Sequence, residues 1–330
     1  MSDVCDIAVI GGGLTGLVAA HHAALSGAKV LHVIGTGLPG GLAANVGALD
    51  GFPAVADPVS ALDIALRLTE QNDALGVDMI AEDVSRIGLD GTTRVLDIAG
   101  DHRFARAVIV ATGARLKMLD APGAQRLFDR GVSQCAWCNG SLHKNQDVVV
   151  VGGGDAALQE ALHLAEYAAS ITILTRGDEL RARRTYIERA MANETISIRP
   201  RSEVVAIHGD DAVTGVRVRS SDGGELELPC SGVFVSIGLT PNAEPIGDLA
   251  QRDARGFILT NADLETATPG IFAAGAVRSG YSGRLTSAMG EGTSAALAAW
   301  KRVGGVRPPA LDALGRVADL NPPSPRRSGS

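Results

Sequence analysis

Two stretches of the chain share one pattern of apolar and polar positions. In the first, the apolar run CDIAVI ends at Ile10, glycines follow, and small apolar residues continue to Ser26 before the run KVLHVI. In the second, VVVV ends at Val151, glycines follow again, and an Ala- and Leu-rich stretch over 156–168 leads to ITILT. An apolar run, a glycine turn, a helical pattern and a second apolar run predict a βαβ unit.

The duplicated unit predicts the fold class. It recurs at the scale of a domain, which is too long for a solenoid repeat, so we expect an α/β protein with two Rossmann-like nucleotide-binding domains. The stretch 203–228 partly alternates and is interrupted by aspartates and glycines, which predicts hairpins. A last helix is expected over 287–302. Further strands are expected over residues 106–114, 231–238 and 270–276.

Composition narrows the function classes. The chain has 330 residues, of which 45% are hydrophobic, so its length suits two domains with sizeable cores. Its 41 glycines and 3% aromatic residues suit tight turns and closely approached ligands. A net charge of −7 without a basic block argues against nucleic acid as a partner.

The two ends of the chain carry weaker signals. No apolar run is long enough to span a bilayer, so no membrane contact is expected. The N-terminus places acids before its apolar run and lacks the basic region and cleavage site of a signal peptide, which predicts a cytoplasmic protein. Residues 303–330 end in NPPSPRRSGS and predict a disordered tail.

The first glycine cluster fits GxGxxG at Gly11, Gly13 and Gly16. One glycine makes the tight turn, one lets a pyrophosphate approach the backbone, and one lets the helix pack closely on the strand. The helix N-terminus offers free N–H groups to the phosphates. Dinucleotide binding is therefore expected, although Ile34 and Gly35 stand where an acid for the ribose hydroxyls is usual.

The second cluster fits GxGxxA at Gly152, Gly154 and Ala157. Its second strand ends without an acid, and Arg176 and Arg181 follow instead. Arginine suits a 2′-phosphate, which favours NADPH over NADH. The alternative is a pair of surface arginines on a turn.

Cys135 and Cys138 form a CxxC just before the second unit. In such a turn one thiol ionises readily and attacks a disulfide, and the other resolves the mixed disulfide. The alternatives are half of a zinc site, which would need two more ligands, or two unrelated core thiols. Cys5 and Cys230 are isolated in the sequence and are predicted to be buried, small hydrophobic residues.

At this point the chain resembles the low-molecular-weight thioredoxin reductase family over residues 3–302. The resemblance rests on an ordered set of motifs: GGGLTGL, VIVATGA, GVSQCAWCNG, VVVVGGGDAALQEAL, TRGDELRA, GVFVSIGLTPN, GIFAAGAV and a Ser-Ala-Met-Gly-Glu-Gly helix start. It implies an FAD domain split into residues 1–115 and 243–302. It also implies an NADPH domain over 116–242 that carries the CxxC and is inserted between those halves.

The resemblance also implies a function. Electrons would pass from NADPH through FAD to the Cys135–Cys138 dithiol and on to a thioredoxin-like protein or a small disulfide. The smaller domain would rotate between steps, with Cys138 next to the flavin and Cys135 attacking substrate, and the protein would be a homodimer. Further cofactor contacts are implied at Asn45, Thr112, Gly113, Gly275, Ala276, Thr286 and Ser287.

Several residues depart from the pattern of that family. Asn139 stands where the family has an aspartate that protonates the leaving thiolate, and Ala276 stands where it has an FAD-contacting aspartate. Asn139 either caps a turn or retunes catalysis. His143 either replaces the missing proton shuttle or is simply solvated.

These departures keep two other functions open. One is an FAD-dependent dithiol oxidase that passes electrons to oxygen, although such an enzyme would have little use for the second glycine turn. The other is a flavin-binding module whose catalysis has decayed, against which the intact CxxC argues.

Overall fold

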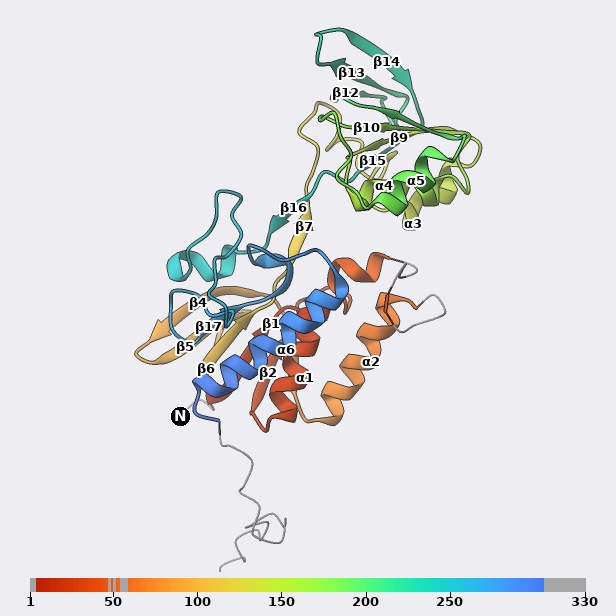
Figure 1. The fold of residues 1–330 in the computed structure, drawn as a ribbon. Helices are drawn as coiled ribbons and strands as arrows, with labels where there is room; N and C mark the ends of the chain where they lie inside the picture. Colours follow the sequence, from red (N-terminus) through yellow and green to blue (C-terminus); the bar gives the residue numbers. More distant parts are fainter. Residues whose placement is uncertain (1–3, 47–48, 50–51, 54–58, 306–330) are drawn as a thin grey trace, which may run out of the picture.

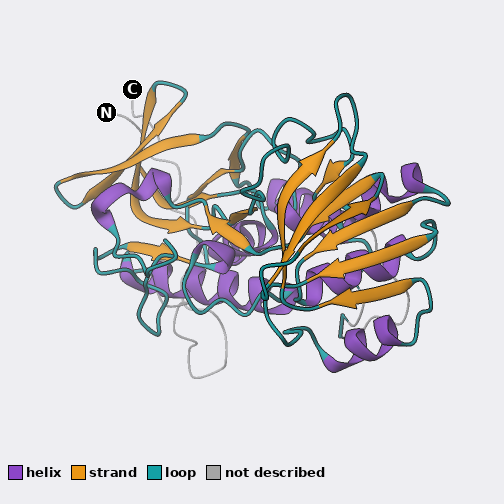
Figure 2. Cartoon of the chain, turned by 90° about the horizontal axis from the view of Figure 1, so that it is seen from above, coloured by secondary structure: helices purple, strands orange, loops and turns teal. Residues whose placement is uncertain are grey.

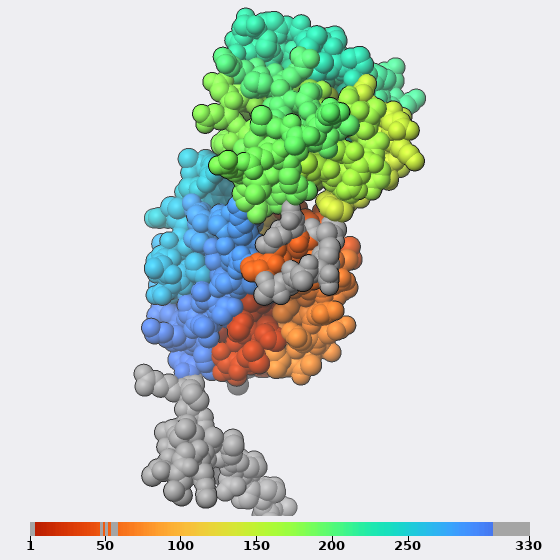
Figure 3. Space-filling view, turned by 45° about the vertical axis from the view of Figure 1, so that its right-hand side comes forward, coloured from red at the N-terminus to blue at the C-terminus, as the bar shows by residue number. Residues whose placement is uncertain are grey.

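The computed structural model describes residues 4–46, 49, 52–53 and 59–305, which form two lobes joined by two chain segments (Figure 1). The space-filling view shows the lobes as two masses, one set upon the other (Figure 3). Of the disordered tail expected over 303–330, the part from 306 onward lies outside the described residues.

The larger lobe is built on a seven-stranded sheet in the order β3-β2-β1-β6-β5-β4, with β17 also paired to β6. Every residue of β2 is buried, as expected of a parallel strand covered on both faces. Helices α1 (Leu14–Leu25) and α6 (Leu285–Arg302) pack together, and α2 (Ala61–Ala74) lies beside α1. The strands are β1 (Val4–Ile10), β2 (Val30–Val33), β3 (Asp78–Ile80), β4 (Val84–Asp90), β5 (Thr93–Ile98), β6 (Asp101–Val110) and β17 (Ile271–Ala273).

The smaller lobe repeats this plan with a parallel sheet in the order β11-β10-β9-β15-β8. Seen from above, the strands fan out side by side with helices packed along them (Figure 2). The strands are β8 (Val132–Ser133), β9 (Asp147–Val151), β10 (Ser170–Leu174), β11 (Ile196–Arg199) and β15 (Gly232–Val235). The helices are α3 (Ala136–Asn139), α4 (Asp155–Leu164) and α5 (Arg184–Met191).

The hairpins expected over 203–228 are present as a three-stranded antiparallel sheet. Its strands are β12 (Ser202–His208), β13 (Gly215–Ser220) and β14 (Glu225–Pro229). Helix α4 ends at Leu164, four residues before the predicted end at Ala168, because the Glu166 N–H donates to the His163 carbonyl and the Tyr167 N–H to the Leu164 carbonyl, which is a tighter three-residue pattern. Short 3₁₀ turns complete the fold: η1 (Gly41–Asn45), η2 (Gly140–His143), η3 (Glu244–Leu249) and η4 (Gly275–Val277).

The lobes are connected through β7 (Ala114–Leu116) and β16 (Leu239–Pro241), which pair antiparallel. Just outside this ladder the Thr112 hydroxyl donates to the Asn242 carbonyl at 2.6 Å. The Asn242 side chain donates back to the Thr112 carbonyl at 3.0 Å. Among the described residues, no helix is long and apolar enough to cross a membrane.

Close packing of α1 on α6 depends on one glycine. A Cβ at Gly292 would lie 2.5 Å from the Thr15 carbonyl oxygen, inside van der Waals contact with the backbone of α1. A Cβ at Gly290, on the same helix, would meet nothing within 4 Å. The two glycines therefore lie on one helix, but only Gly292 faces the backbone of α1 closely enough to exclude a side chain.

Gly292→Ala should destabilise the protein by about 1–3 kcal/mol, because the added methyl forces α6 away from α1. Gly290→Ala is the matched control and should stabilise it by about 0.5–1 kcal/mol through helix propensity. Urea unfolding of the two variants measures both effects. Equal midpoints would contradict the packing argument.

Candidate active site

The first glycine turn connects β1 to α1. Gly11 has φ +117°, and a Cβ there would lie 2.3 Å from the Ala111 carbonyl oxygen. A Cβ at Gly16 would lie 1.9 Å from the Gly11 carbonyl oxygen, so this glycine lets the helix approach the turn. A Cβ at Gly13 would meet nothing within 4 Å, which leaves that side of the turn open to a ligand. The three glycines thus divide the tasks that a pyrophosphate-binding turn requires.

A buried histidine forms a hydrogen bond with the backbone of this turn. His32 on β2 is fully buried, and its Nε2 lies 3.0 Å from the Gly11 carbonyl oxygen. Because a carbonyl only accepts, Nε2 carries the hydrogen and donates. Burial lowers the pKa of His32 to about 4, so the ring is neutral at ordinary pH. Sequence reasoning missed His32, although a polar residue within the apolar run KVLHVI was a visible signal.

An acid does lie beside the end of β2, but it comes from another part of the chain. A Cβ at Gly35 would lie 3.2 Å from the Asp83 carboxylate, and the Thr36 hydroxyl donates to the same carboxylate at 3.3 Å. Asp83 stands between β3 and β4. The sequence could not reveal it, because the parallel pairing of β2 with β3 brings the two segments together.

The second glycine turn repeats the geometry of the first. Gly152 has φ +142°, and a Cβ there would lie 2.2 Å from the Ser236 carbonyl oxygen. A Cβ at Gly154 would meet nothing within 4 Å, and Ala157 is fully buried below the turn. Arg181 donates its backbone N–H to the Gly153 carbonyl at 2.7 Å. The side chains of Arg176 and Arg181 are exposed on the loop that follows β10.

Asp155, the first residue of α4, joins the two lobes. Its carboxylate accepts from Arg284 of the larger lobe at 2.7 Å and from Arg183 of its own lobe at 3.0 Å. It also accepts from the Arg183 N–H, and these partners hold the pKa of Asp155 below its usual value although partial burial acts to raise it. The second glycine turn therefore ends at an ion pair between the lobes.

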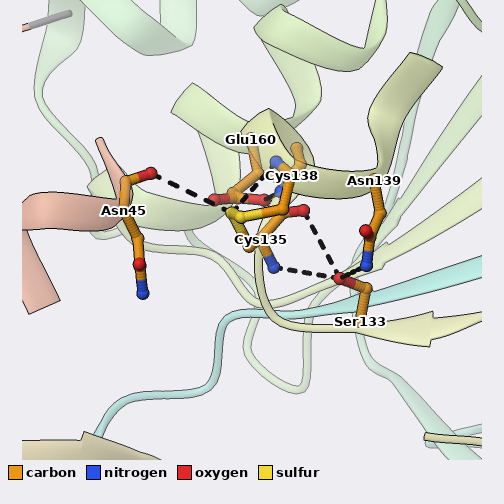
Figure 4. The surroundings of a disulfide bond; sticks show 7 residues. Asn45, Ser133, Cys135, Cys138, Asn139 and Glu160 are labelled. Carbon is orange, nitrogen blue, oxygen red and sulfur yellow. Dashed lines mark hydrogen bonds between the residues drawn. A yellow bond between two sulfur atoms is a disulfide. The ribbon is translucent and has the colours of Figure 1, made fainter. Parts of the chain in front are cut away.

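Cys135 and Cys138 are joined by a disulfide at the start of α3 (Figure 4). The Cys138 N–H donates to the Cys135 sulfur at 3.1 Å. On the other side, the Cys135 sulfur lies 3.9 Å from the carbonyl oxygen of Asn45 in the larger lobe. Within the described residues, no group of three or more His, Cys, Asp or Glu side chains is placed to hold a metal ion.

Two residues near the disulfide have other partners. The Asn139 amide donates to the Ser133 hydroxyl at 3.0 Å (Figure 4). His143 is buried, with Nδ1 2.9 Å from the Ser231 hydroxyl and its ring edge-on to Phe234. Burial lowers the pKa of His143, so its neutral form is favoured.

A cleft of about 1190 Å³ lies between the lobes and collects many of the expected residues. Both cysteines line the same space as the first glycine turn, and Asp83 and Tyr281 lie on its wall. Gly16, Gly275, Thr286, Ser287, His143 and the residues of the second turn do not line it. Those that line it are Gly11, Gly13, Asn45, Thr112, Gly113, Cys135, Cys138, Asn139 and Ala276.

The sequence matches known proteins along most of its length. Residues 5–292 match the pyridine nucleotide-disulphide oxidoreductase family. The chain belongs to this family. A thioredoxin reductase of Streptomyces clavuligerus is 37% identical over 300 residues, which cover 90% of this chain and 93% of that protein. The crystal structure of Lactococcus lactis thioredoxin reductase in its FR conformation has TM-score 0.87 at 34% identity, covering 92% of this chain and 100% of that one.

As a member of this family, the chain is an NAD(P)H-dependent disulfide oxidoreductase of the thioredoxin reductase type, and its cofactors are FAD and NADPH. The two glycine turns fit two dinucleotides, because each has an open glycine at the N-terminus of a helix. The fit at Ala276 is poorer, since its methyl group offers no hydrogen bond to a flavin cofactor.

The other two cysteines of this oxidoreductase are set apart from the cleft. Burial raises the pKa of Cys5 to about 11 and that of Cys230 to about 12. Both thiols are buried in apolar clusters, Cys5 in the larger lobe and Cys230 in the smaller one. They are therefore structural hydrophobes and poor nucleophiles.

After chemical reduction, alkylation of the folded protein near neutral pH should modify Cys135 and Cys138 quickly and leave Cys5 and Cys230 largely intact. At about pH 8, a thiol whose pKa is 11 or more is ionised to about a thousandth or less. Peptide mass spectrometry over time measures each site separately. If Cys5 or Cys230 is labelled as fast as the dithiol, the cleft does not hold the reactive thiols.

Proposed function

We propose that this oxidoreductase is a reductase that carries electrons from NADPH through FAD to the Cys135–Cys138 disulfide and then to a thioredoxin-like protein, or to a small disulfide. One observation carries the proposal: both sulfurs line the same cleft as the open side of the first glycine turn. The second glycine turn supports the direction, because a dithiol oxidase has no need of a nicotinamide site.

The FAD site proposed here lies in the larger lobe, residues 1–115 and 243–302. The first glycine turn receives the pyrophosphate at Gly13, with Gly11 and Gly16 shaping the turn. Asp83 is placed to accept from ribose hydroxyls, as an acid at the end of the second strand does in other dinucleotide folds. When bound, FAD takes up a hydride from the nicotinamide and delivers two electrons to a disulfide. Asn45, Thr112, Gly113, Gly275, Ala276, Thr286 and Ser287 are proposed as further contacts.

The NADPH site proposed here lies in the smaller lobe, residues 116–242. The pyrophosphate rests at Gly154 on the N-terminus of α4, with Gly152 and Ala157 allowing the close turn. Arg176 and Arg181 receive the 2′-phosphate on the exposed loop after β10. Arginine presents a planar fork that matches phosphate oxygens.

The dithiol is assigned two roles. Cys138 exchanges electrons with the flavin, and Cys135 attacks the substrate disulfide, as in the family that the sequence resembles. In the present arrangement the Cys135 sulfur faces Asn45, so a protein substrate needs the smaller lobe to turn. The β7–β16 ladder is the proposed axis, because both crossings between the lobes run through it. A homodimer remains a prediction by resemblance, and the cytoplasmic location expected from the sequence remains a prediction.

Cys135→Ser and Cys138→Ser should each abolish NADPH-driven reduction of thioredoxin, because each variant lacks one sulfur of the exchanging pair. Anaerobic reduction of the flavin by NADPH should persist in both. Cys135→Ser should also retain a long-wavelength absorption band from Cys138 beside the flavin. Cys230→Ala, which removes a buried thiol that does not line the cleft, is the matched control and should keep full activity.

Two results would redirect the assignment. Oxygen consumption driven by a dithiol without NADPH would favour the oxidase. Cysteine variants that behave like the unaltered protein in every redox assay would indicate a flavin-binding module whose CxxC is structural.

Arg176→Ala should raise the KM for NADPH by about tenfold or more and leave the KM for NADH nearly unchanged, since a charge-assisted hydrogen bond to phosphate contributes about 1.5–3 kcal/mol. Arg184→Ala removes an exposed arginine that is paired with Glu188 at 2.6 Å, and it is the control. Stopped-flow flavin reduction with both nucleotides measures the preference. An unaltered protein that uses NADH as efficiently as NADPH would refute the assignment.

A further inference from the structure

Reducing a disulfide to a thiolate and a thiol requires a proton, and the residue after the CxxC does not supply it here. Asn139 has no ionisable group, and its amide is engaged with Ser133. The ring of His143 is bonded to Ser231. The reduced flavin releases one proton as it is oxidised, and the group of this chain that passes a proton to and from the dithiol must be one other than Asn139 or His143.

A carboxyl group lies directly against the CxxC turn. Glu160, on α4, accepts a hydrogen bond from the backbone N–H of Ala136, the residue bonded to Cys135 (Figure 4). In the described part of the chain, no other carboxyl group hydrogen-bonds to this turn. Trp137 stacks on His163 at 3.7 Å, one helical turn beyond Glu160, and this contact fixes α3 on α4. Glu160 is thus held against the backbone of the CxxC turn by the packing of two helices.

We propose that Glu160 is the group that exchanges a proton with Cys135 during turnover. This proposal rests on the function proposed above. Two-electron cleavage of the disulfide leaves the Cys138 sulfur as a thiolate, and the proton of Glu160 passes to the Cys135 sulfur. Before exchange with substrate, the Cys135 thiol returns a proton to ionised Glu160, and the resulting thiolate attacks the substrate disulfide.

The environment of Glu160 suits this task. Burial raises the pKa of its carboxyl to about 7, while the hydrogen bond from Ala136 acts to lower it. Because this pKa lies above the ordinary value, the folded protein holds the proton up to near neutral pH and releases it above. A proton donor is most effective when its pKa is close to the operating pH.

The neighbouring titratable groups have partners of their own. Tyr186 on α5 is bonded to Gln159 and Arg183, and Asp147 on β9 accepts from Ser170. On α4 itself, Asp155 pairs with Arg183 and Arg284, and His163 lies 3.7 Å from Glu166. His143 on η2 is bonded to Ser231. Cys135, at the N-cap of α3, and Cys138, within α3, are therefore the titratable groups with which Glu160 can exchange a proton.

The test uses Cys138→Ser, which leaves Cys135 as a single reactive thiol, and measures its alkylation rate across pH with and without Glu160→Gln. Gln keeps an oxygen that can accept from Ala136 but loses the ionisation. The alkylation rate of the Glu160→Gln protein divided by that of its parent should be near one below about pH 6, where Glu160 is already neutral. It should rise toward about tenfold between the pKa of Glu160 and that of the thiol, because a nearby like charge raises a thiol pKa by about one unit. It should return to one at higher pH, where the thiol is ionised in both proteins. Glu166→Gln, an exposed carboxyl beside His163, is the control and should leave the profile unchanged.

A ratio that stays constant at every pH would indicate a structural role for Glu160 and would overturn the proposal, as would superimposable profiles. If Glu160→Gln does not fold, Glu160→Asp carries the test, since it keeps the charge but withdraws it by one methylene; a profile identical to that of its parent would then contradict the proposal. In the complete enzyme, Glu160→Gln should lower turnover by about 10²-fold, and unchanged turnover would also overturn it. Alkylation needs neither NADPH nor a disulfide substrate, so its failure is distinct from failure of the proposed function.

Discussion

The pairing of β7 with β16 is the constraint on which the arrangement of the site depends. Both chain crossings between the lobes run through this short ladder. The reciprocal hydrogen bonds of Thr112 and Asn242 fix the end of the ladder where Ala114 pairs with Pro241. Because the smaller lobe is attached here, the ladder sets where the CxxC turn meets the larger lobe. The sulfur of Cys135 consequently lies 3.9 Å from the Asn45 carbonyl oxygen, and Cys135 lines the same cleft as the first glycine turn.

Because the site is divided between two lobes, nucleotide binding is linked to movement of the smaller lobe. Asp155 begins the helix at the second glycine turn and also holds Arg284 across the lobes, so a nucleotide at that turn and the contact between the lobes share one residue. A partly exposed ion pair of this kind contributes about 1 kcal/mol, so it orients the lobes without locking them. Glu160, in contrast, moves with the dithiol, because both lie on the smaller lobe. A proton carried by Glu160 therefore stays at the CxxC turn whichever way the smaller lobe faces.

Much of this was predictable from local sequence. Both glycine turns and the CxxC stand in unbroken motifs, and their flanking strands and helices were predicted to within a few residues. The sequence did not reveal Asp83, which reaches the end of β2 through strand pairing, or Glu160, which meets Ala136 through helix packing. Contacts of that kind join residues far apart in the chain, and no spacing rule encodes them. Helix α2 was also missed, and only Ala61, Ala65 and Asn72 of its residues are buried.

The central claim is that electrons are stored on the dithiol as well as on the flavin. Anaerobic titration of the purified flavoprotein with dithionite, followed by its absorption spectrum, counts the electrons taken up for each flavin. The account predicts that the unaltered protein takes up one electron pair more than Cys135→Ser does, because its disulfide accepts that pair. Equal uptake by the two proteins would show that the Cys135–Cys138 disulfide does not communicate with the flavin and would contradict the account.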